Sequence, residues 1–244
     1  MSEKVLYVEL TPREFKERLL KAPIAYLPLG TLEWHGRHMP LGADGLISSG
    51  FFIELAKKVG GIVLPMLFLG PDNSRIVDGK EYYGMDIKSY PSQHPQKLLG
   101  SAYWINKKLF RDVLIEILKQ LKRASFKIVV AHGHGPSTLV FYKSIKKWRK
   151  EFGLELFICW RDKETDGLGI QTDHAAANET SLMMALRPDL VKIENLSKEK
   201  DKKPLGLQGK DPREFASSEK GKRIISLQIE RIAEILKETL NKIN

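Results

Sequence analysis

Residues 24–44 read IAYLPLGTLEWHGRHMPLGAD, and this stretch decides the fold. Its first six residues are an apolar run that predicts a buried strand over Ile24–Leu29, and the polar, glycine-rich residues 31–43 predict a loop. A helix is expected from Asp44 to Val59, where two glycines end it and a second buried strand follows over 62–66. Strand, loop, helix and strand make a βαβ unit, the building block of an α/β fold with a parallel sheet.

The rest of the chain continues this alternation of strands and helices. Apolar or alternating runs predict further strands over 5–10, 126–131 and 154–160. Helical spacing predicts helices over 12–21 (with a capping box at Thr11 and Glu14), 96–123, from about 136 onward, 178–186 and 227–243. Residues 67–95 have no sustained period, and because so long a loop is usually functional, we expect it to cover a site. Together these elements predict one domain over residues 1–244, with three α/β/α layers and a mainly parallel sheet.

The composition is typical of a globular protein with a hydrophobic core. Of the 244 residues, 42% are hydrophobic and 29% are charged, which excludes disorder, collagen and coiled coil as overall descriptions. The longest apolar runs fall far short of the roughly 18 to 20 residues that span a bilayer, and the N-terminus lacks the pattern of a signal peptide. We therefore expect a cytoplasmic protein without a membrane segment. Because Cys159 is the one cysteine, any metal must be held by His, Asp and Glu.

Positive charge is concentrated in two segments. The chain has 40 basic and 30 acidic residues, and residues 107–150 alone have twelve basic residues against two acidic ones. Such a surface can bind nucleic acid or another anion, but the interleaved Leu and Ile favour the solvated outer faces of two amphipathic helices. Residues 192–223, with ten basic and six acidic residues, have a linker-like composition. We expect them to form an ordered basic excursion before the C-terminal helix, packed on this subunit or on a neighbour.

Polar side chains follow two of the predicted strands. The run Glu33-Trp34-His35-Gly36-Arg37-His38, with Asp44 after it, follows the strand 24–29, and His132-Gly133-His134 follows the strand 126–131. Ligands of a parallel sheet gather outside the carboxyl ends of its strands, so both loops are expected to form one site. Carboxylate and imidazole groups bind Zn²⁺, Mn²⁺ or Fe²⁺, and a shared aspartate such as Asp44 can bridge two ions about 3.5 to 4 Å apart.

Three blocks of sequence resemble the creatininase family of metal-dependent amidohydrolases. Residues 27–44, LPLGTLEWHGRHMPLGAD, are similar to its opening pattern, which is approximately Pro-x-Gly-Ser/Ala-x-Glu-x-His-Gly-x-His-x-Pro and ends in an aspartate. Gly133-His134-Gly135 resembles the core of its Asn-Gly-His-Gly loop. His174, followed by Glu179-Thr180-Ser181-Leu182, is similar to its His-x4-Glu-Thr-Ser-Leu segment. The order and spacing of the blocks agree over about residues 5 to 191, so the resemblance implies a creatininase-like α/β/α fold.

The resemblance also implies roles for these residues. Glu33 and His35 would each bind one metal ion, Asp44 would bridge both ions, and His134 would complete the first set. Two divalent ions (Zn, Mn or Fe) per chain would supply metal-bound hydroxide as the nucleophile. His174 resembles the family's catalytic histidine, which would shuttle a proton or stabilise the oxyanion.

One ligand of the family is missing from this chain. In creatininase a glutamate two residues beyond the loop histidine binds the second metal, whereas Pro136 stands there in this sequence. Glu179 is the first candidate to replace it, although its place in the first turn of a helix equally fits the helix dipole. His132 is the second candidate. If neither reaches, the enzyme would hold one ion.

The middle loop also departs from the family, which has a Pro-Gly-Thr segment there. The residues Tyr82–Asp86 and Tyr90–Pro95 carry many hydroxyl and carboxamide groups, which suit a polar, hydroxylated ring better than compact creatinine. Tyr83, Asp173 and Trp160 are therefore candidate substrate-binding residues, with a core role left open for Trp160.

The expected function is a metal-dependent hydrolase that opens a small polar cyclic substrate. The bond would be an amide, as in creatinine or a formamide-bearing pyrimidine, or a C–C bond of a cyclic diketone derived from a polyol such as inositol. The alternative is an anion-binding or nucleic-acid-binding protein on a vestigial enzyme scaffold. The resemblance further implies a homo-oligomer, often a hexamer.

Overall fold

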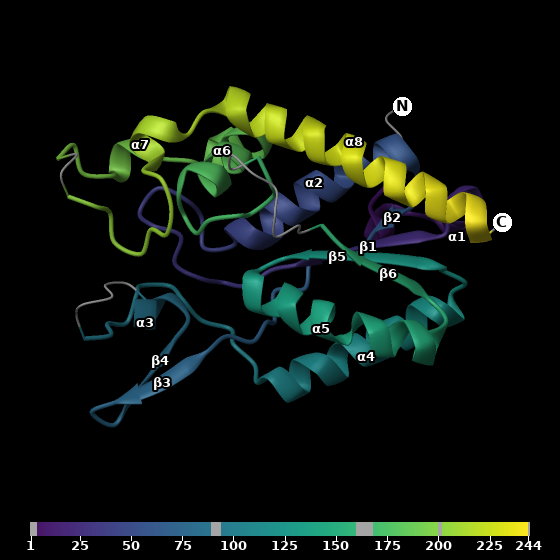
Figure 1. Ribbon diagram of the computed structural model, residues 1–244, viewed down its shortest axis with the longest axis horizontal. Helices are drawn as coiled ribbons and strands as arrows, with labels where there is room; N and C mark the ends of the chain where they lie inside the picture. The colour runs from purple at the N-terminus through teal and green to yellow at the C-terminus, as the bar shows by residue number, and fades with distance from the viewer. Residues whose placement is uncertain (1–3, 89–93, 160–167, 200–201, 244) are drawn as a thin grey trace.

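A four-stranded parallel sheet forms the centre of the computed structural model, which describes residues 4–88, 94–159, 168–199 and 202–243 (Figure 1). Its strands are β1 (Ile24–Leu29), β2 (Ile62–Val63), β5 (Ile128–Gly133) and β6 (Glu155–Ile158), in the order β2-β1-β5-β6. Every pairing within this sheet is parallel. The prediction of an α/β fold with a parallel sheet is therefore confirmed.

Helices cover both faces of the sheet, because successive side chains of a strand point to opposite faces. Ile24, Tyr26 and Val130 belong to one hydrophobic cluster, together with α2 (Ala43–Val59), α6 (Ala177–Leu186) and α8 (Ser218–Ile243). The alternate residues, such as Ala25 and Val129, belong to a second cluster with α1 (Pro12–Lys21), α4 (Lys107–Arg123) and α5 (Gly135–Phe152). Figure 1 shows α2 and α8 on one side of the sheet and α4 and α5 on the other. The three α/β/α layers follow directly from this alternation.

The sheet register brings the two expected site loops together. Leu29, the last residue of β1, pairs with Gly133, the last residue of β5. The backbone N–H of His134 donates to the carbonyl of Leu29 at 2.9 Å. The loop that follows β1 and the residue that follows β5 therefore start side by side, at the carboxyl edge of the sheet.

The N-terminal strand prediction is wrong. Leu6 forms a single parallel bridge with Val63, and Tyr7–Glu9 form the short 3₁₀ helix η1. The chain must turn at once into α1, where Thr11 and Glu14 form the predicted capping box. The short alternation in 5–10 is thus not that of a strand: Val5 is buried, but Val8 is largely exposed.

The long loop and the helix predicted after it also need correction. Residues 67–95 contain the antiparallel hairpin β3 (Ser74–Val77) and β4 (Lys80–Tyr83), and the short helix α3 (Met85–Lys88). Asp78 and Gly79 form its turn with φ of 49° and 71°, the Asp-Gly pattern of a tight hairpin. Asn106 caps α4 through Leu109 N–H, so the helix begins at Lys107 and not at residue 96.

The basic segment 192–223 packs on this chain as far as the structure describes it. It includes the 3₁₀ helix η4 (Ile193–Asn195) and the helix α7 (Pro212–Phe215), and it follows a further 3₁₀ helix, η3 (Pro188–Leu190). Arg213 donates to the carbonyls of Ser197, Glu199 and Lys202. The last residues of the segment 192–223 belong to α8, which begins at Ser218 rather than at residue 227. In the described part of the chain, no helix is both long enough and apolar enough to cross a bilayer.

Candidate metal centre

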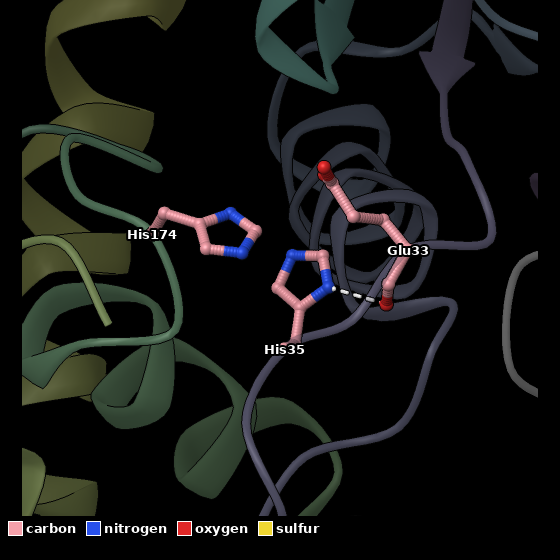
Figure 2. Close-up of side chains that lie close together, drawn as sticks. All are labelled: Glu33, His35 and His174. Atoms are coloured by element: carbon pink, nitrogen blue, oxygen red, sulfur yellow. Dashed lines mark hydrogen bonds between the residues drawn. The ribbon is translucent and has the colours of Figure 1, made fainter. Parts of the chain in front are cut away.

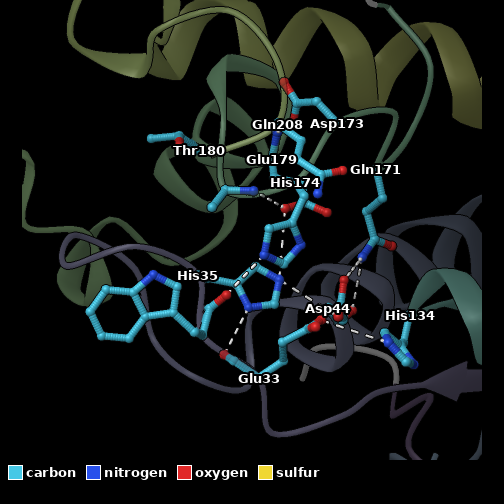
Figure 3. A network of polar contacts seen from close by, with 12 residues as sticks. Glu33, His35, Asp44, His134, Gln171, Asp173, His174, Glu179, Thr180 and Gln208 are labelled. Atoms are coloured by element: carbon cyan, nitrogen blue, oxygen red, sulfur yellow. Dashed lines mark hydrogen bonds and ion pairs between the residues drawn. The ribbon is translucent and has the colours of Figure 1, made fainter. Parts of the chain in front are cut away.

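Five polar side chains from separate parts of the sequence converge at the carboxyl edge of the sheet (Figure 3). Glu33 and His35 lie in the loop after β1, His134 follows β5, Asp44 lies in the first turn of α2, and Glu179 lies in the first turn of α6. Each of these side chains is buried. Burial of so many ionisable groups is costly unless their charges are compensated, which marks this cluster as a site rather than a surface feature.

Two groups of possible metal ligands overlap at one residue. Ligand atoms of Glu33, Asp44 and His134 lie within 4.8 Å of one another, and so do ligand atoms of His35, Asp44 and Glu179. Asp44 belongs to both groups. Two adjacent groups that share a carboxylate are consistent with a binuclear centre. A third group, Glu33, His35 and His174, meets the same criterion.

The histidine rings of the two groups are oriented by hydrogen bonds on their far side. Nδ1 of His35 lies 3.0 Å from the Glu33 carbonyl oxygen, which can only accept, so Nδ1 carries the proton (Figure 2). Nε2 of His35 then faces Asp44 Oδ2 at 3.6 Å and Glu179 Oε2 at 3.7 Å. Nδ1 of His134 likewise lies 3.0 Å from Ser137 Oγ. Metal-binding histidines are commonly fixed by such a bond from the second ring nitrogen.

The atoms that face the centre of the site are those without hydrogen bonds. Among the described residues, His35 Nε2, His134 Nε2 and Asp44 Oδ2 are buried and have no hydrogen-bond partner. Buried polar atoms are normally satisfied, so a group of orphaned ligand atoms that point to one place is a specific signal. Divalent cations would satisfy all three atoms, and the donor set of imidazole and carboxylate fits Zn²⁺, Mn²⁺ or Fe²⁺.

Burial and the neighbouring histidines together shift the pKa values of the carboxyl groups in different directions. Burial raises the pKa of Glu33 to about 7, although His134 and His35 act against it. It raises the pKa of Glu179 well above its usual value. Burial also acts to raise the pKa of Asp44, but the adjacent His35 outweighs it and holds the pKa below its usual range. Asp44 is therefore the carboxylate most firmly held in its charged form.

The imidazoles supply the positive charge that these carboxylates require. Burial lowers the pKa of His35, but the carboxylates of Asp44, Glu179 and Glu33 outweigh this effect and raise it to about 10. The pKa of His134 is raised as well, because its carboxylate neighbours outweigh burial. The metal-free site thus holds protons where divalent cations would replace them.

His174 lies beside this centre, and its pKa shifts in the opposite direction from those of His35 and His134. Its Nε2 donates to the Trp34 carbonyl oxygen at 2.8 Å, and its ring lies 4.4 Å from that of His35 (Figure 2). Burial and the neighbouring His35 lower the pKa of His174 to about 3, so the ring is neutral. With the proton on Nε2, Nδ1 is free to accept one.

A small cavity opens onto these residues. Its volume is about 160 Å³, and its walls include Glu33, Asp44, His134, His174 and Glu179, together with Asp173, Gln171 and Gln208. Pockets for drug-sized ligands are larger, at about 300 Å³ or more, so this cavity fits a small molecule.

The structure places the three predicted substrate-binding residues differently. Asp173 lines the cavity, but both its carboxylate oxygens accept backbone N–H groups, from Asn178 and Glu179. Tyr83 is not among the described lining residues; its ring stacks on Trp104 at 6.3 Å. Trp160 lies outside the described residues.

Sequence reasoning missed two residues of the site and left one alternative undecided. Gln171 donates to Asp44 Oδ1 at 3.0 Å and so orients the shared carboxylate. Asp72 Oδ2 lies 3.4 Å from His134 Nε2. Asp72 stands in the loop that was expected to cover the site, but neither residue has a spacing that points to it. Between the two candidates for the missing ligand, Glu179 belongs to a metal-capable group, whereas His132, like Asp72, belongs to none of these groups among the described residues.

Comparison with known proteins agrees with this geometry. The sequence profile of the creatininase family, described as creatinine amidohydrolase, matches residues 8–236. The chain belongs to the creatininase family. The creatinine amidohydrolase of Pseudomonas putida is 25% identical over an alignment 270 residues long. The alignment covers 98% of this chain and 98% of that protein.

Solved creatininase structures share the fold. A mutant creatininase of the Zn-Zn type has a TM-score of 0.73 at 23% identity, with 98% of this chain and 99% of that one covered. A manganese creatininase has a TM-score of 0.71 at 22% identity, with 97% and 98% covered. At this identity the structures establish the fold of the chain and leave the substrate open.

Proposed function

We propose that this protein is a metal-dependent hydrolase that holds two divalent ions on either side of Asp44 and opens a small cyclic substrate. The observation that carries the proposal is the pair of buried ligand groups, Glu33–Asp44–His134 and His35–Asp44–Glu179, which share Asp44. Membership of the creatininase family and the zinc and manganese forms of its relatives support the choice of Zn²⁺ or Mn²⁺, with Fe²⁺ as a third candidate.

The residues around the ions have separable tasks. Divalent ions, when bound, lower the pKa of a coordinated water toward neutrality and polarise a carbonyl group. Gln171 keeps the Asp44 carboxylate in place, and the hydrogen bonds at Nδ1 fix the rings of His35 and His134. His174 lines the cavity as a neutral imidazole, and its unprotonated Nδ1 can take a proton and pass it to the leaving group.

The cavity limits the substrate by size and polarity. A volume of about 160 Å³ accommodates a small ring, and the carboxamides of Gln171 and Gln208 add hydrogen-bonding groups to the carboxylates and imidazoles of its wall. The bond opened would be an amide, as in creatinine or a formamide-bearing pyrimidine, or a C–C bond of a cyclic diketone derived from a polyol such as inositol. We further propose that the active form is a homo-oligomer, as the family resemblance implies.

A reconstitution experiment tests the proposal. Chelator-treated protein is loaded with Zn²⁺, Mn²⁺ or Fe²⁺ and assayed against creatinine, a formamide-bearing pyrimidine and an inositol-derived cyclic diketone. Glu33→Ala and Asp44→Ala are expected to lower the hydrolysis rate more than about 100-fold, since even changes behind the ligands cost up to that factor. Asp78→Asn, at the exposed hairpin turn, is the control and should keep the wild-type rate. Full activity in either alanine variant would contradict the proposal.

A further inference from the structure

The wall of the metal centre near Pro136 is closed by a different part of the chain. Pro136 lines the cavity two residues after His134, and its ring carries no donor atom. The segment before β3 brings a carboxylate, Asp72, to the same cavity. We propose that Asp72 is a ligand of the ion held by Glu33, Asp44 and His134, an inference that rests on the proposed metal-dependent function.

The two oxygens of Asp72 have different surroundings. Oδ1 accepts the backbone N–H of Asn73 at 2.6 Å, a local bond that shapes the turn. Oδ2 points the other way and lies 3.4 Å from Nε2 of His134. This nitrogen is buried and has no hydrogen-bond partner among the described residues. Oδ2 is therefore the oxygen that could join His134 Nε2 in holding an ion.

The carboxylate of Asp72 has a cationic neighbour in His134. Its side chain is 7% exposed, and a carboxylate so deeply buried is costly unless a positive group offsets it. Within the described part of the chain, His134 is the one cationic group whose nitrogen lies within 4.0 Å of this carboxylate. A cation bound at this group would lie next to the Asp72 carboxylate and offset its charge.

A glycine allows this carboxylate to approach Glu33. A Cβ atom at Gly84 would lie 2.6 Å from Asp72 Oδ2 and 2.7 Å from Glu33 Oε1, closer than real Cβ contacts. Gly84 thus leaves room for two carboxylates on one side of the cavity. The carboxylates of Asp72 and Glu33 repel each other when both are charged. A divalent cation bound beside them would offset this repulsion.

Metal titration of Asp72→Asn tests the inference without an activity assay. The asparagine keeps an oxygen for Asn73 N–H and loses the charge at the other position. Zn²⁺ is titrated into the chelator-treated, full-length protein by calorimetry, and the bound metal is then counted by elemental mass spectrometry. The wild type is expected to bind two ions per chain, and Asp72→Asn to bind one ion unchanged and the other at least about tenfold more weakly.

A second buried aspartate provides the matched control. Asp86 is buried as well, but its oxygens accept the backbone N–H groups of Leu98 and Tyr83. Asp86→Asn should keep both ions, and the same loss of zinc in Asp86→Asn as in Asp72→Asn would overturn the inference by assigning the effect to the fold of this region.

The remaining outcomes separate this inference from the proposed function. If Asp72→Asn binds two ions as tightly as the wild type, Asp72 is not a ligand and the binuclear hydrolase stands. If the wild type binds one ion, and Asp72→Asn binds it as tightly, the inference fails and so does the two-ion form of the proposed function. If the wild type binds none, the proposed function fails together with the inference.

Discussion

His35 and Glu33 store protons in the metal-free site, and this has a consequence for stability. The pKa of His35 rises from 6.5 to about 10, and that of Glu33 from 4.5 to about 7. A group whose pKa is higher in the folded protein stabilises the fold below its unfolded pKa and loses this contribution as the pH rises through the folded value. The contribution of Glu33 is therefore lost between about pH 4.5 and pH 7, and that of His35 between about pH 6.5 and pH 10.

We expect the metal-free protein to lose stability between pH 7 and pH 9. In this range the loss comes from His35, which contributes a slope of at most about 1.4 kcal/mol per pH unit between its unfolded and its folded pKa. Thermal melting of chelator-treated protein at several pH values measures the trend, and the zinc-loaded protein should show a weaker one because the bound ions replace the protons. A melting temperature of the metal-free form that rises over this range would contradict the assigned shifts.

The close approach of β1 and β5 positions the loops that carry Glu33 and His134. Gly133 ends β5 with φ of 143°, and a Cβ atom there would lie 1.7 Å from the Leu29 carbonyl oxygen. The two strands that deliver Glu33 and His134 to the site therefore meet at a point where a side chain does not fit.

Gly133→Ala is expected to destabilise the protein by at least about 2 kcal/mol, because it strains the backbone and separates β1 from β5. Gly79→Ala is the matched control: its φ is also positive, at 71°, but nothing lies within 4 Å of the added Cβ. We expect about 1 kcal/mol for this variant. Urea unfolding measures both values, and equal losses would show that the strand junction is not under this constraint.

The elements differ in how well their own sequence predicts them. Thr11 and Glu14 cap α1 within one turn, and the buried run Ile24–Leu29 is a strand as expected, because local chemistry determines both. The hairpin at Asp78-Gly79 carried a usable signal that was outweighed by the polar composition around it. The start of α8 at Ser218 was hidden in the same way, by the basic residues of 192–223.

The site itself was only partly predictable. Glu33, His35, Asp44, His134 and Glu179 stand out in the sequence because they follow strand ends or match a family pattern, and the structure brings them together. Asp72 and Gln171 have no such mark. They reach the site through the tertiary arrangement of a hairpin and an irregular loop, which no local pattern encodes.

The basic residues of 107–150 form an exposed surface on the outside of the molecule. The basic residues of 107–150 lie on α4, α5 and the connection between them, and all except Arg149 are exposed. Between them, the second hydrophobic cluster buries Leu114, Leu118, Leu121 and Val140. This pattern is that of two amphipathic helices with solvated outer faces, as the sequence favoured, and the helices cover the sheet rather than the cavity.

At the scale of the whole molecule, strand ends and helix starts bring together two groups of ligands that share Asp44, where we propose that two metal ions bind. The most direct measurement is an anomalous difference map at the zinc edge from crystals of the zinc-loaded protein. We predict two peaks in contact with the Asp44 carboxylate, one beside Glu33 and His134 and the other beside His35 and Glu179. A map with no peak at Asp44, or with zinc only on the protein surface, would contradict the account.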